Sequence, residues 1–445
     1  MSNKWLIIII LGVSILTHFI FFGHPKETVF DEVHFGKFVS GYYTHQYFFD
    51  IHPPLGKLMI AGFGKLFDFN PSFSFANIGD KFPDNKYMAL RFLPTLAGAL
   101  LPVIIFLLAL QLGFSKTASF CSAIFVVLES GLLVQSRLIL MDAFLLLFGF
   151  SALLFYFKFR KDKHWKNLLW FGIMGGLSAS VKWTGIAFIG LPAVIELFFI
   201  LRDSHFKKLI NLALFFVVTP FVVYFSIFTI HFSLLTKSGP GDAFMTLAFQ
   251  KTLAGSIYEK DPSLKTPNLI SKFFELNYQL YDSNRRLTAT HPYSSKFYTW
   301  PFMIRPIYYW IGGDTPGTSE RIYFIGNPFL WWASTVAVIF LIFYSIFRPK
   351  TINQTSIILF VGYIINYLPF VGIGRVMFLY HYLAALIFAI LILAYVIDQF
   401  KNKVLIFGGL LFLFAVSFIY FAPFTYGLKL SPASYQEHIW LKSWE

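Results

Sequence analysis

Cysteine and charged residues are both scarce in this chain. Its 445 residues include one cysteine, Cys121, which lies inside an apolar run, so an intramolecular disulfide is excluded. Charged residues make up 13% of the sequence and hydrophobic residues 57%, including 58 phenylalanines. Soluble domains carry about 25% charged residues. This composition therefore indicates a polytopic membrane protein.

Several common site motifs are also missing. The sequence has no HExxH motif, no Cys/His metal spacing, no phosphate-binding glycine loop, no internal repeat and no low-complexity linker. The formal net charge is +14. The basic residues nevertheless fall mostly in short loops between apolar runs, which argues against a nucleic-acid partner.

Apolar runs long enough to cross a hydrocarbon core of about 30 Å recur along the chain. A weaker run at 168–181 is included, because without it the basic loops at 158–166 and 202–208 would fall on opposite sides of the membrane. The eleven expected spans are 5–22, 88–110, 117–134, 138–157, 168–181, 184–201, 208–232, 326–347, 354–372, 377–397 and 403–422. The expected fold class is an all-α polytopic membrane protein with short juxtamembrane helices in its external loops.

The basic loops also predict the orientation. With eleven spans, the loops at 158–166, 202–208, 347–350 and 398–403 share one side, which the positive-inside rule makes cytoplasmic. The N-terminus is then inside and the C-terminus outside. The first run lacks a small-residue cleavage site, so we interpret it as an anchor rather than a signal peptide. Residues 1–445 form one membrane domain in this interpretation, with three external polar segments at 23–87, 233–325 and 423–445.

Ionisable residues gather on the external side of the predicted spans. One such residue at a bilayer centre costs at least about 2.5 kcal/mol, so their positions are informative. Each could snorkel to the interface alone, but six on one side favour a site that faces the exterior. A transporter would instead place its binding groups near the midplane. The six residues are Arg91, Glu129, Arg137, Asp142, Lys182 and Arg375.

The polar stretch at 29–65 follows the first span. It begins with the adjacent carboxylates Asp31 and Glu32, and histidines and lysines follow them. A carboxylate there could act as a general base, and the cations could hold a lipid phosphate. Alternatively, Asp31 caps a short interfacial helix that starts near Val33, and the basic side chains face water.

Six motifs then occur in order over most of the chain: FDEVHFGKF, FFDIHPPLGK, LILMDAFLLLF, SVKWTG, HPYSSKFYTWPFMIRPIYYW and GRVMFLYHYLAAL. As a set they resemble the protein O-mannosyltransferases, which are C-type glycosyltransferases. The resemblance implies inverting transfer of a sugar, usually mannose, from a polyprenyl-phosphate carrier to a Ser or Thr hydroxyl of an acceptor protein. Residues 233–325 leave too little room for the β-trefoil (MIR) domain of eukaryotic members. The chain therefore resembles a bacterial or archaeal member, located in the inner cell membrane.

The resemblance also implies roles for individual residues. Asp31 is the expected base, and Glu32 orients the acceptor or tunes Asp31. Arginine binds phosphate bidentately, so Arg91 and Arg375 are the first expected ligands of the donor phosphate, followed by Lys57 and Lys182. No cofactor and no metal are expected. The expected substrate-binding residues are His52, Asp142, His291, Tyr293 and His381.

Alternatives remain for several of these residues. His52 precedes two prolines and fits a structural turn equally well. Tyr293 and Trp300 fit an aromatic interfacial belt, and His381 could hydrogen-bond another span. A C-type transferase that modifies a glycolipid or an envelope polymer is a second functional hypothesis. A transporter or lipid-binding protein is the third.

Overall fold

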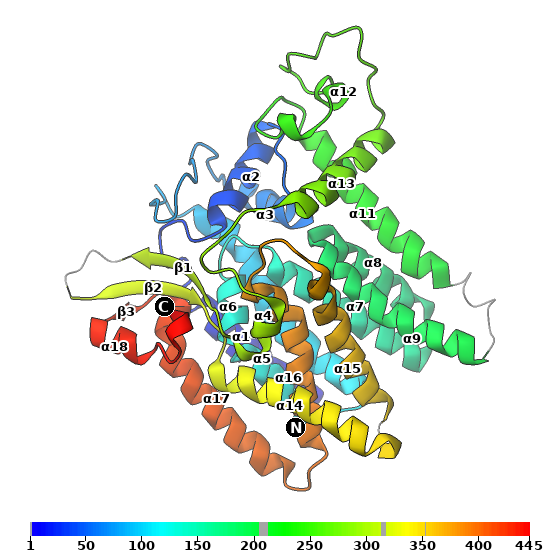
Figure 1. The fold of residues 1–445 in the computed structure, drawn as a ribbon, viewed down its shortest axis with the longest axis vertical. Coiled ribbons are helices and arrows are strands. Elements are labelled where there is room, and N and C mark those ends of the chain that lie inside the picture. The colour runs from blue at the N-terminus through cyan, green and yellow to red at the C-terminus, as the bar shows by residue number, and fades with distance from the viewer. Residues whose placement is uncertain (1, 204–211, 313–316, 352) are drawn as a thin grey trace.

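The computed structural model describes residues 2–203, 212–312, 317–351 and 353–445, and long helices dominate it (Figure 1). Within these residues, eight helical segments are long and apolar enough to cross a membrane. They are α4 (Tyr87–Gln111), α7 (Asp142–Asp162), η1 with α9 (Trp183–Ile186 and Ala187–Asp203), η2 with α11 (Leu214–Val218 and Thr219–Leu234), α14 (Pro328–Phe347), α15 with η6 (Gln354–Tyr367 and Leu368–Gly372), η7 with α16 (Leu379–Tyr382 and Leu383–Asp398) and α17 (Lys403–Tyr426).

The expected count of eleven spans is not confirmed. The run at 117–134 forms two helices, α5 (Lys116–Val127) and α6 (Ser130–Ser136), which are bent by 58° and raise the count to nine if they form one span. Helices α1 (Asn3–Phe19) and α8 (Trp165–Val181) have 17 residues each. This length is at the lower end of the roughly 17–25 residues that span a membrane, and neither helix is among the eight.

One end of the bundle carries the basic loops. The Asp398 carboxylate accepts hydrogen bonds from Ser115 Oγ at 2.5 Å and from Lys403 Nζ at 2.8 Å. Lys161 Nζ donates to the carbonyl of Leu110 at 3.3 Å. The loops at 158–166 and 398–403 therefore lie at the same end, in agreement with the predicted topology. The expected loop at 202–208 lies mostly outside the described residues.

Short helices gather at the opposite end, as the sequence predicts. They are α2 (Glu32–Thr44), α3 (Leu55–Lys65), α12 (Leu247–Gln250) and α13 (Leu269–Arg286), drawn near the top of Figure 1. Helix α13 begins at an N-cap, where the Asn268 side chain accepts a hydrogen bond from the Ser271 N–H at 2.8 Å.

A small antiparallel sheet, which the sequence did not predict, accompanies the helices. Its strands are β1 (Ile307–Gly312), β2 (Ser319–Phe324) and β3 (Lys429–Leu430), in the order β1-β2-β3. Tyr308 pairs with Tyr323, and Ser319 pairs with Leu430. The strand IYYWIG is rich in β-branched and aromatic residues, which favour strands. Through β3, the sheet joins the 233–325 segment to the C-terminal tail, which continues through α18 (Pro432–Glu437) and η8 (Lys442–Trp444).

Burial separates central from peripheral helices. The apolar windows of α7 and α16 are each 72% buried within the protein, whereas the window of η2 and α11 is 17% buried. Helix α11 leaves Phe221, Val222 and Ile230 about half exposed. Exposed apolar area of this extent is typical of a surface that meets lipid or another protein. In an integral membrane protein, these side chains are therefore expected to lie outside water.

Candidate active site

Asp31 stands at the N-cap position of α2, but its side chain makes no capping hydrogen bond. The side chain is partly exposed, and it forms no hydrogen bond or ion pair with another described residue. Helix α2 therefore does not use the Asp31 carboxylate for its own stability. The capping alternative is not supported, and both oxygens are free to accept a proton or a hydrogen bond.

The backbone before Asp31 holds this carboxylate in place. Phe30 has a φ of 46°, in the left-handed region that is costly for a bulky residue. Its N–H donates to the carbonyl of Tyr309 in β1 at 3.2 Å, and the two rings stack with centroids 4.0 Å apart. Strain of this kind persists only where the surroundings fix it, and it is concentrated at functional sites.

The surroundings of Asp31 raise its pKa to about 7. Desolvation is the largest cause, and the Lys182 ammonium opposes it. The carboxylates of Asp142 and Asp50 add to the upward shift. A carboxyl group with a pKa near neutrality can accept a proton at physiological pH and also exists partly as the acid.

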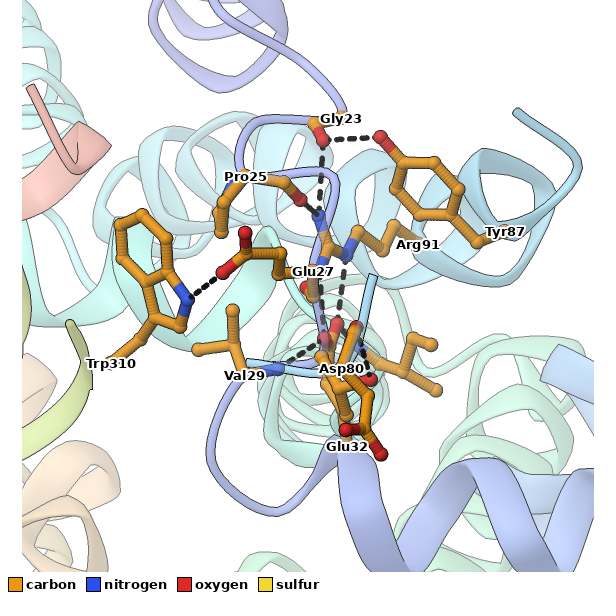
Figure 2. Close-up of polar contacts among 11 residues, drawn as sticks. Gly23, Pro25, Glu27, Val29, Glu32, Asp80, Tyr87, Arg91 and Trp310 are labelled. Atoms are coloured by element: carbon orange, nitrogen blue, oxygen red, sulfur yellow. Dashed lines mark hydrogen bonds and ion pairs between the residues drawn. The ribbon is translucent and has the colours of Figure 1, made fainter. Parts of the chain in front are cut away.

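Glu32 is a buried partner of Arg91, as Figure 2 shows. Its Oε1 lies 2.7 Å from Arg91 Nε, and its Oε2 lies 2.7 Å from Arg91 Nη2. The main-chain N–H groups of Val29 and Ile139 each donate to Glu32 at 2.9 Å. Four donors thus occupy both oxygens, which favours a structural role, while contact with an acceptor or tuning of Asp31 by Glu32 stays a prediction. Glu32 holds the backbone on which Asp31 lies.

Arg91 is also fully engaged within the protein, which favours a structural role over its predicted contact with the donor phosphate. Both Arg91 and Glu32 have 0% exposed side chains. The guanidinium has five N–H donors, and it directs two to Glu32 and three to main-chain carbonyls in the segment before Asp31 (Figure 2). These carbonyls belong to Gly23, Pro25 and Glu27, at 3.2, 2.7 and 2.8 Å. No donor is left for a ligand.

Lys57 is occupied in the same way. Its ammonium forms an ion pair with Asp50 and donates to the carbonyls of His52 and Pro53 at 2.8 and 3.3 Å. An ammonium has three donors, so this geometry favours a structural role for Lys57, and its binding of phosphate stays a prediction. Burial lowers the pKa of Lys57 and the Asp50 carboxylate raises it. Lys57 therefore fixes the turn at His52.

Lys182 and Asp142 form an ion pair, and both charges change the pKa of Asp31. Lys182 Nζ lies 2.7 Å from Asp142 Oδ1, and the Gln135 amide donates to Asp142 Oδ2 at 2.8 Å. Tyr309 Oη donates to Gln135 Oε1 at 2.6 Å, which links the pair to the residue stacked on Phe30. The Lys182 ammonium also lies 5.4 Å from the centroid of the Tyr380 ring. Two of its three donors remain open.

Arg375 and the imidazole of His52 have no hydrogen-bond partner among the described side chains and backbone. Burial lowers the pKa of both groups. For His52, the cations of Lys182, Lys57 and Arg375 lower the pKa further, so the ring is neutral at pH 7. A half-buried, unpaired guanidinium beside a neutral imidazole is suited to an anionic, hydroxyl-bearing ligand.

Of the remaining predicted substrate residues, His291 and Tyr293 lie in a loop, and His381 lies in η7 at the start of a candidate span. His381 Nδ1 lies 2.9 Å from the carbonyl of Phe378, within its own 3₁₀ turn, and its ring stacks on Trp300. The predicted bond from His381 to another span is absent from the described residues. His291 Nδ1 accepts from the Tyr293 N–H at 3.2 Å, and the His291 ring packs against Phe378. Among the described residues, no three His, Cys, Asp or Glu side chains group as metal ligands.

Three polar residues at this site were not predicted from the sequence. Gln135 and Asp50 orient Asp142 and Lys57, and Tyr380 lies under Lys182. The Tyr380 hydroxyl has no hydrogen-bond partner in the described structure, and its environment includes Asp31, Asp142 and Arg375. Tyr380 precedes His381 in the motif FLYHY, so the motif itself was the available signal.

Solved structures share this fold. The structure of the Saccharomyces cerevisiae protein O-mannosyltransferase Pmt1-Pmt2 complex bound to the sugar donor matches with a TM-score of 0.91 at 22% identity, over 100% of this chain and 93% of that chain. The apo Archaeoglobus fulgidus oligosaccharyltransferase matches with a TM-score of 0.54 at 14% identity, over 100% of this chain and 56% of that chain. The predicted C-type glycosyltransferase fold is thereby confirmed.

Sequence comparisons give the family. Dolichyl-phosphate-mannose-protein mannosyltransferase 4 of Candida albicans is 40% identical over 263 residues, and that of Saccharomyces cerevisiae is 33% identical over 295. These matches span 55% and 61% of this chain but only 35% and 37% of the relatives. The family model for dolichyl-phosphate-mannose-protein mannosyltransferase matches residues 8–236, and the model for the C-terminal four-transmembrane region of protein-O-mannosyltransferase matches 269–444. The chain is an integral membrane protein that belongs to the protein O-mannosyltransferase family.

Proposed function

We propose that the chain transfers a mannosyl residue from a polyprenyl-phosphate donor to Ser or Thr hydroxyls of proteins, with inversion. The observation that carries this proposal is the free Asp31 carboxylate, whose pKa is raised to about 7 beside the Lys182 ammonium. The names of the relatives support the donor and the acceptor class.

The reaction has a simple balance of bonds. The acceptor oxygen forms a bond to the anomeric carbon while the bond from that carbon to the phosphate oxygen breaks. The hydroxyl proton passes to Asp31, and the electron pair of the broken bond leaves with the lipid phosphate. A positioned base contributes about 10²- to 10⁴-fold to such a step.

The leaving phosphate gains charge, so fixed cations near Asp31 would stabilise the transition state. We assign this role to Lys182 and Arg375, because both have donors that the protein does not use. Asp142 orients Lys182 through their 2.7 Å ion pair. His52, His291, Tyr293 and His381 remain proposed contacts to the sugar or the acceptor, and we propose no metal or other cofactor.

The proposed function is tested with purified protein in nanodiscs, supplied with radiolabelled polyprenyl-phosphate-mannose and a peptide rich in Ser and Thr. Label is expected on the peptide, and a matched peptide with Ala at every Ser and Thr should remain unlabelled. EDTA should leave the rate unchanged. Label on a glycolipid, with none on the peptide, would contradict the protein acceptor and support the glycolipid hypothesis.

The proposed base makes a testable prediction about pH. Transfer should increase with pH through an apparent pKa near 7, because only the ionised Asp31 accepts the proton. The Lys182 cation lowers the pKa of Asp31, so Lys182→Met should move this limb of the pH–rate profile to higher pH. Arg375→Met is the matched control, because Arg375 is not among the groups that shift Asp31. A limb that stays in place in Lys182→Met would contradict the assignment of the limb to Asp31.

We also propose that the site faces the exterior of a prokaryotic cell membrane and that the N-terminus is cytoplasmic. With Cys121 replaced by Ser, Ser283→Cys and Ser434→Cys should react with an impermeant maleimide in intact cells. Lys163→Cys should react only after permeabilisation, because its loop lies at the basic end of the bundle. Protection of position 283 together with labelling of position 163 would reverse the orientation.

A further inference from the structure

A row of aromatic side chains leads from the candidate active site to the small sheet. It starts at Tyr380, whose ring stacks on Phe378 with centroids 5.4 Å apart. Phe378 packs against His291 at 5.1 Å, and the rings of His291 and Tyr293 lie 5.9 Å apart. Tyr293 then stacks on Tyr308 of β1 at 6.1 Å. All five residues are partly exposed, so this aromatic row forms part of the surface of the protein.

The aromatic row continues across the sheet to α18, which lies beside the sheet in Figure 1. Tyr308 pairs with Tyr323 of β2, and their rings meet edge to face at 4.9 Å. Tyr323 Oη in turn lies 2.8 Å from Tyr435 Oη in α18. Alternate residues of a strand point to the same face, so Arg321 lies on the face that carries Tyr323. The Arg321 guanidinium is stacked on the Tyr435 ring, with Cζ 3.7 Å from the centroid.

Arg321 ends the aromatic row with a charge that the protein does not neutralise. Its Nε is buried without a hydrogen-bond partner, and the guanidinium forms no ion pair within the described parts of the chain. Arg305, the cation over Tyr293, differs because it donates to the carbonyls of Pro292 and Ser443. A stacked arginine presents a planar fork of donors that matches a carboxylate. Arg321 is therefore suited to an acidic group that the protein itself does not supply.

The shape and charge of this surface fit an extended polypeptide. Aromatic-lined grooves bind extended, proline-containing segments. An extended chain advances about 3.3 Å per residue, so the distance from Tyr380 to Tyr435 matches at most about ten residues. A neutral glycan would also stack on the rings, but it would leave the Arg321 charge unpaired. Charge complementarity therefore favours a polypeptide with an acidic side chain at the Arg321 end.

We propose that the aromatic row docks the acceptor polypeptide beside the modified Ser or Thr, and that Arg321 selects an Asp or Glu several residues away from it. The proposal rests on the proposed transfer to proteins and gives that reaction a preference for acidic flanks. Tyr308, Tyr435 and Arg321 are binding residues in this scheme and take no part in the proton transfer at Asp31.

The first test uses the unmodified protein in nanodiscs with saturating polyprenyl-phosphate-mannose. Each acceptor is a peptide of Ala and Pro with a single Thr, and with one Asp or one Lys placed up to about ten residues away on either side. At one distance the KM of the Asp peptide should be about fivefold below that of the Lys peptide, with similar kcat. Transfer with equal KM values for Asp and Lys at every position would overturn this inference alone. Absence of transfer to all peptides would overturn the proposed function and this inference with it.

The second test reverses the charge of the selecting residue. Arg321→Met should abolish the preference for Asp, and Arg321→Glu should prefer Lys at the same position, a reversal that a merely structural role would not produce. Lys429→Met is the matched control, because this exposed lysine pairs with Glu320 on the opposite face of the sheet. It should keep the preference for Asp. Arg321→Glu protein that retains this preference, while its circular dichroism and size-exclusion profiles match the wild type, would contradict the proposal.

Discussion

Replacing Asp31 with Asn is expected to reduce turnover at saturating donor by about 10²-fold or more, with donor affinity nearly unchanged. The amide keeps the size of the side chain but cannot accept the acceptor proton. Stability should be little affected, because the Asp31 carboxylate neither caps α2 nor pairs with another described residue. The measurements are the transfer rate with saturating polyprenyl-phosphate-mannose, donor affinity in nanodiscs and the thermal midpoint of the purified variant.

Asp68→Asn is the matched control for this change. Asp68 is an exposed carboxylate in the same polar segment, 23–87, and its φ of 52° is a conformation that Asn tolerates well. Turnover should therefore remain at the wild-type level. Near-normal turnover in folded Asp31→Asn would remove Asp31 from the mechanism and leave it as an ordinary residue at the start of α2.

The pattern of charges in the sequence predicted that ionisable residues would gather at one end of the bundle, and several of them do lie together in the structure. Asp142, Lys182 and Arg375 are separated by as many as 233 residues, yet their placement at one end of the apolar runs brought them to the surroundings of Asp31 and Tyr380. An ionisable group is costly inside a bilayer, so such residues must collect at its faces or pair. The positions of ionisable residues relative to the apolar runs can therefore be predicted from the sequence alone.

The pattern did not distinguish free cations from paired ones. Arg91 and Arg375 look equivalent in the sequence, because both lie at the edges of apolar runs. Arg91 meets Glu32, which is 59 residues away, and three carbonyls in an irregular segment. Hydrogen-bond partners in irregular backbone depend on tertiary geometry, for which no helical or strand period gives a signal.

The sequence also failed to predict where one apolar run is broken into two helices. The run at 117–134 is continuous in hydropathy, but Glu129 accepts hydrogen bonds from the N–H groups of Gly131 and Asn327, both at 2.9 Å. It also caps α6, so the run divides into two helices bent by 58°. A buried carboxylate needs donors, and exposing the Gly131 N–H requires a helix end. Glu129 therefore accounts for the break, and its partner Asn327 could not be identified from the sequence.

The ion pair between Glu32 and Arg91 supports the second large expected effect. Removing one partner of a buried pair leaves an uncompensated charge and costs about 3–5 kcal/mol. Arg91→Met should therefore lower the free energy of unfolding by about this amount, because Glu32 stays buried and three carbonyls lose their donor. The loss should appear as a lower thermal midpoint and a smaller yield of monodisperse protein. In the fraction that remains folded, the KM for donor should be close to wild type.

Arg375→Met makes the same chemical change at a guanidinium that has no partner in the described structure. Its thermal midpoint should be retained, while its donor KM increases, since each lost charge-assisted hydrogen bond to phosphate is worth about 1.5–3 kcal/mol, or about 10- to 100-fold. The pair of variants therefore separates an arginine that holds the fold from one that holds the substrate. The double variant Glu32→Gln/Arg91→Met should be more stable than Arg91→Met alone, because the buried charge is removed with its partner. A normal thermal midpoint and a raised donor KM in Arg91→Met would return Arg91 to the phosphate site and assign Glu32 to the reaction.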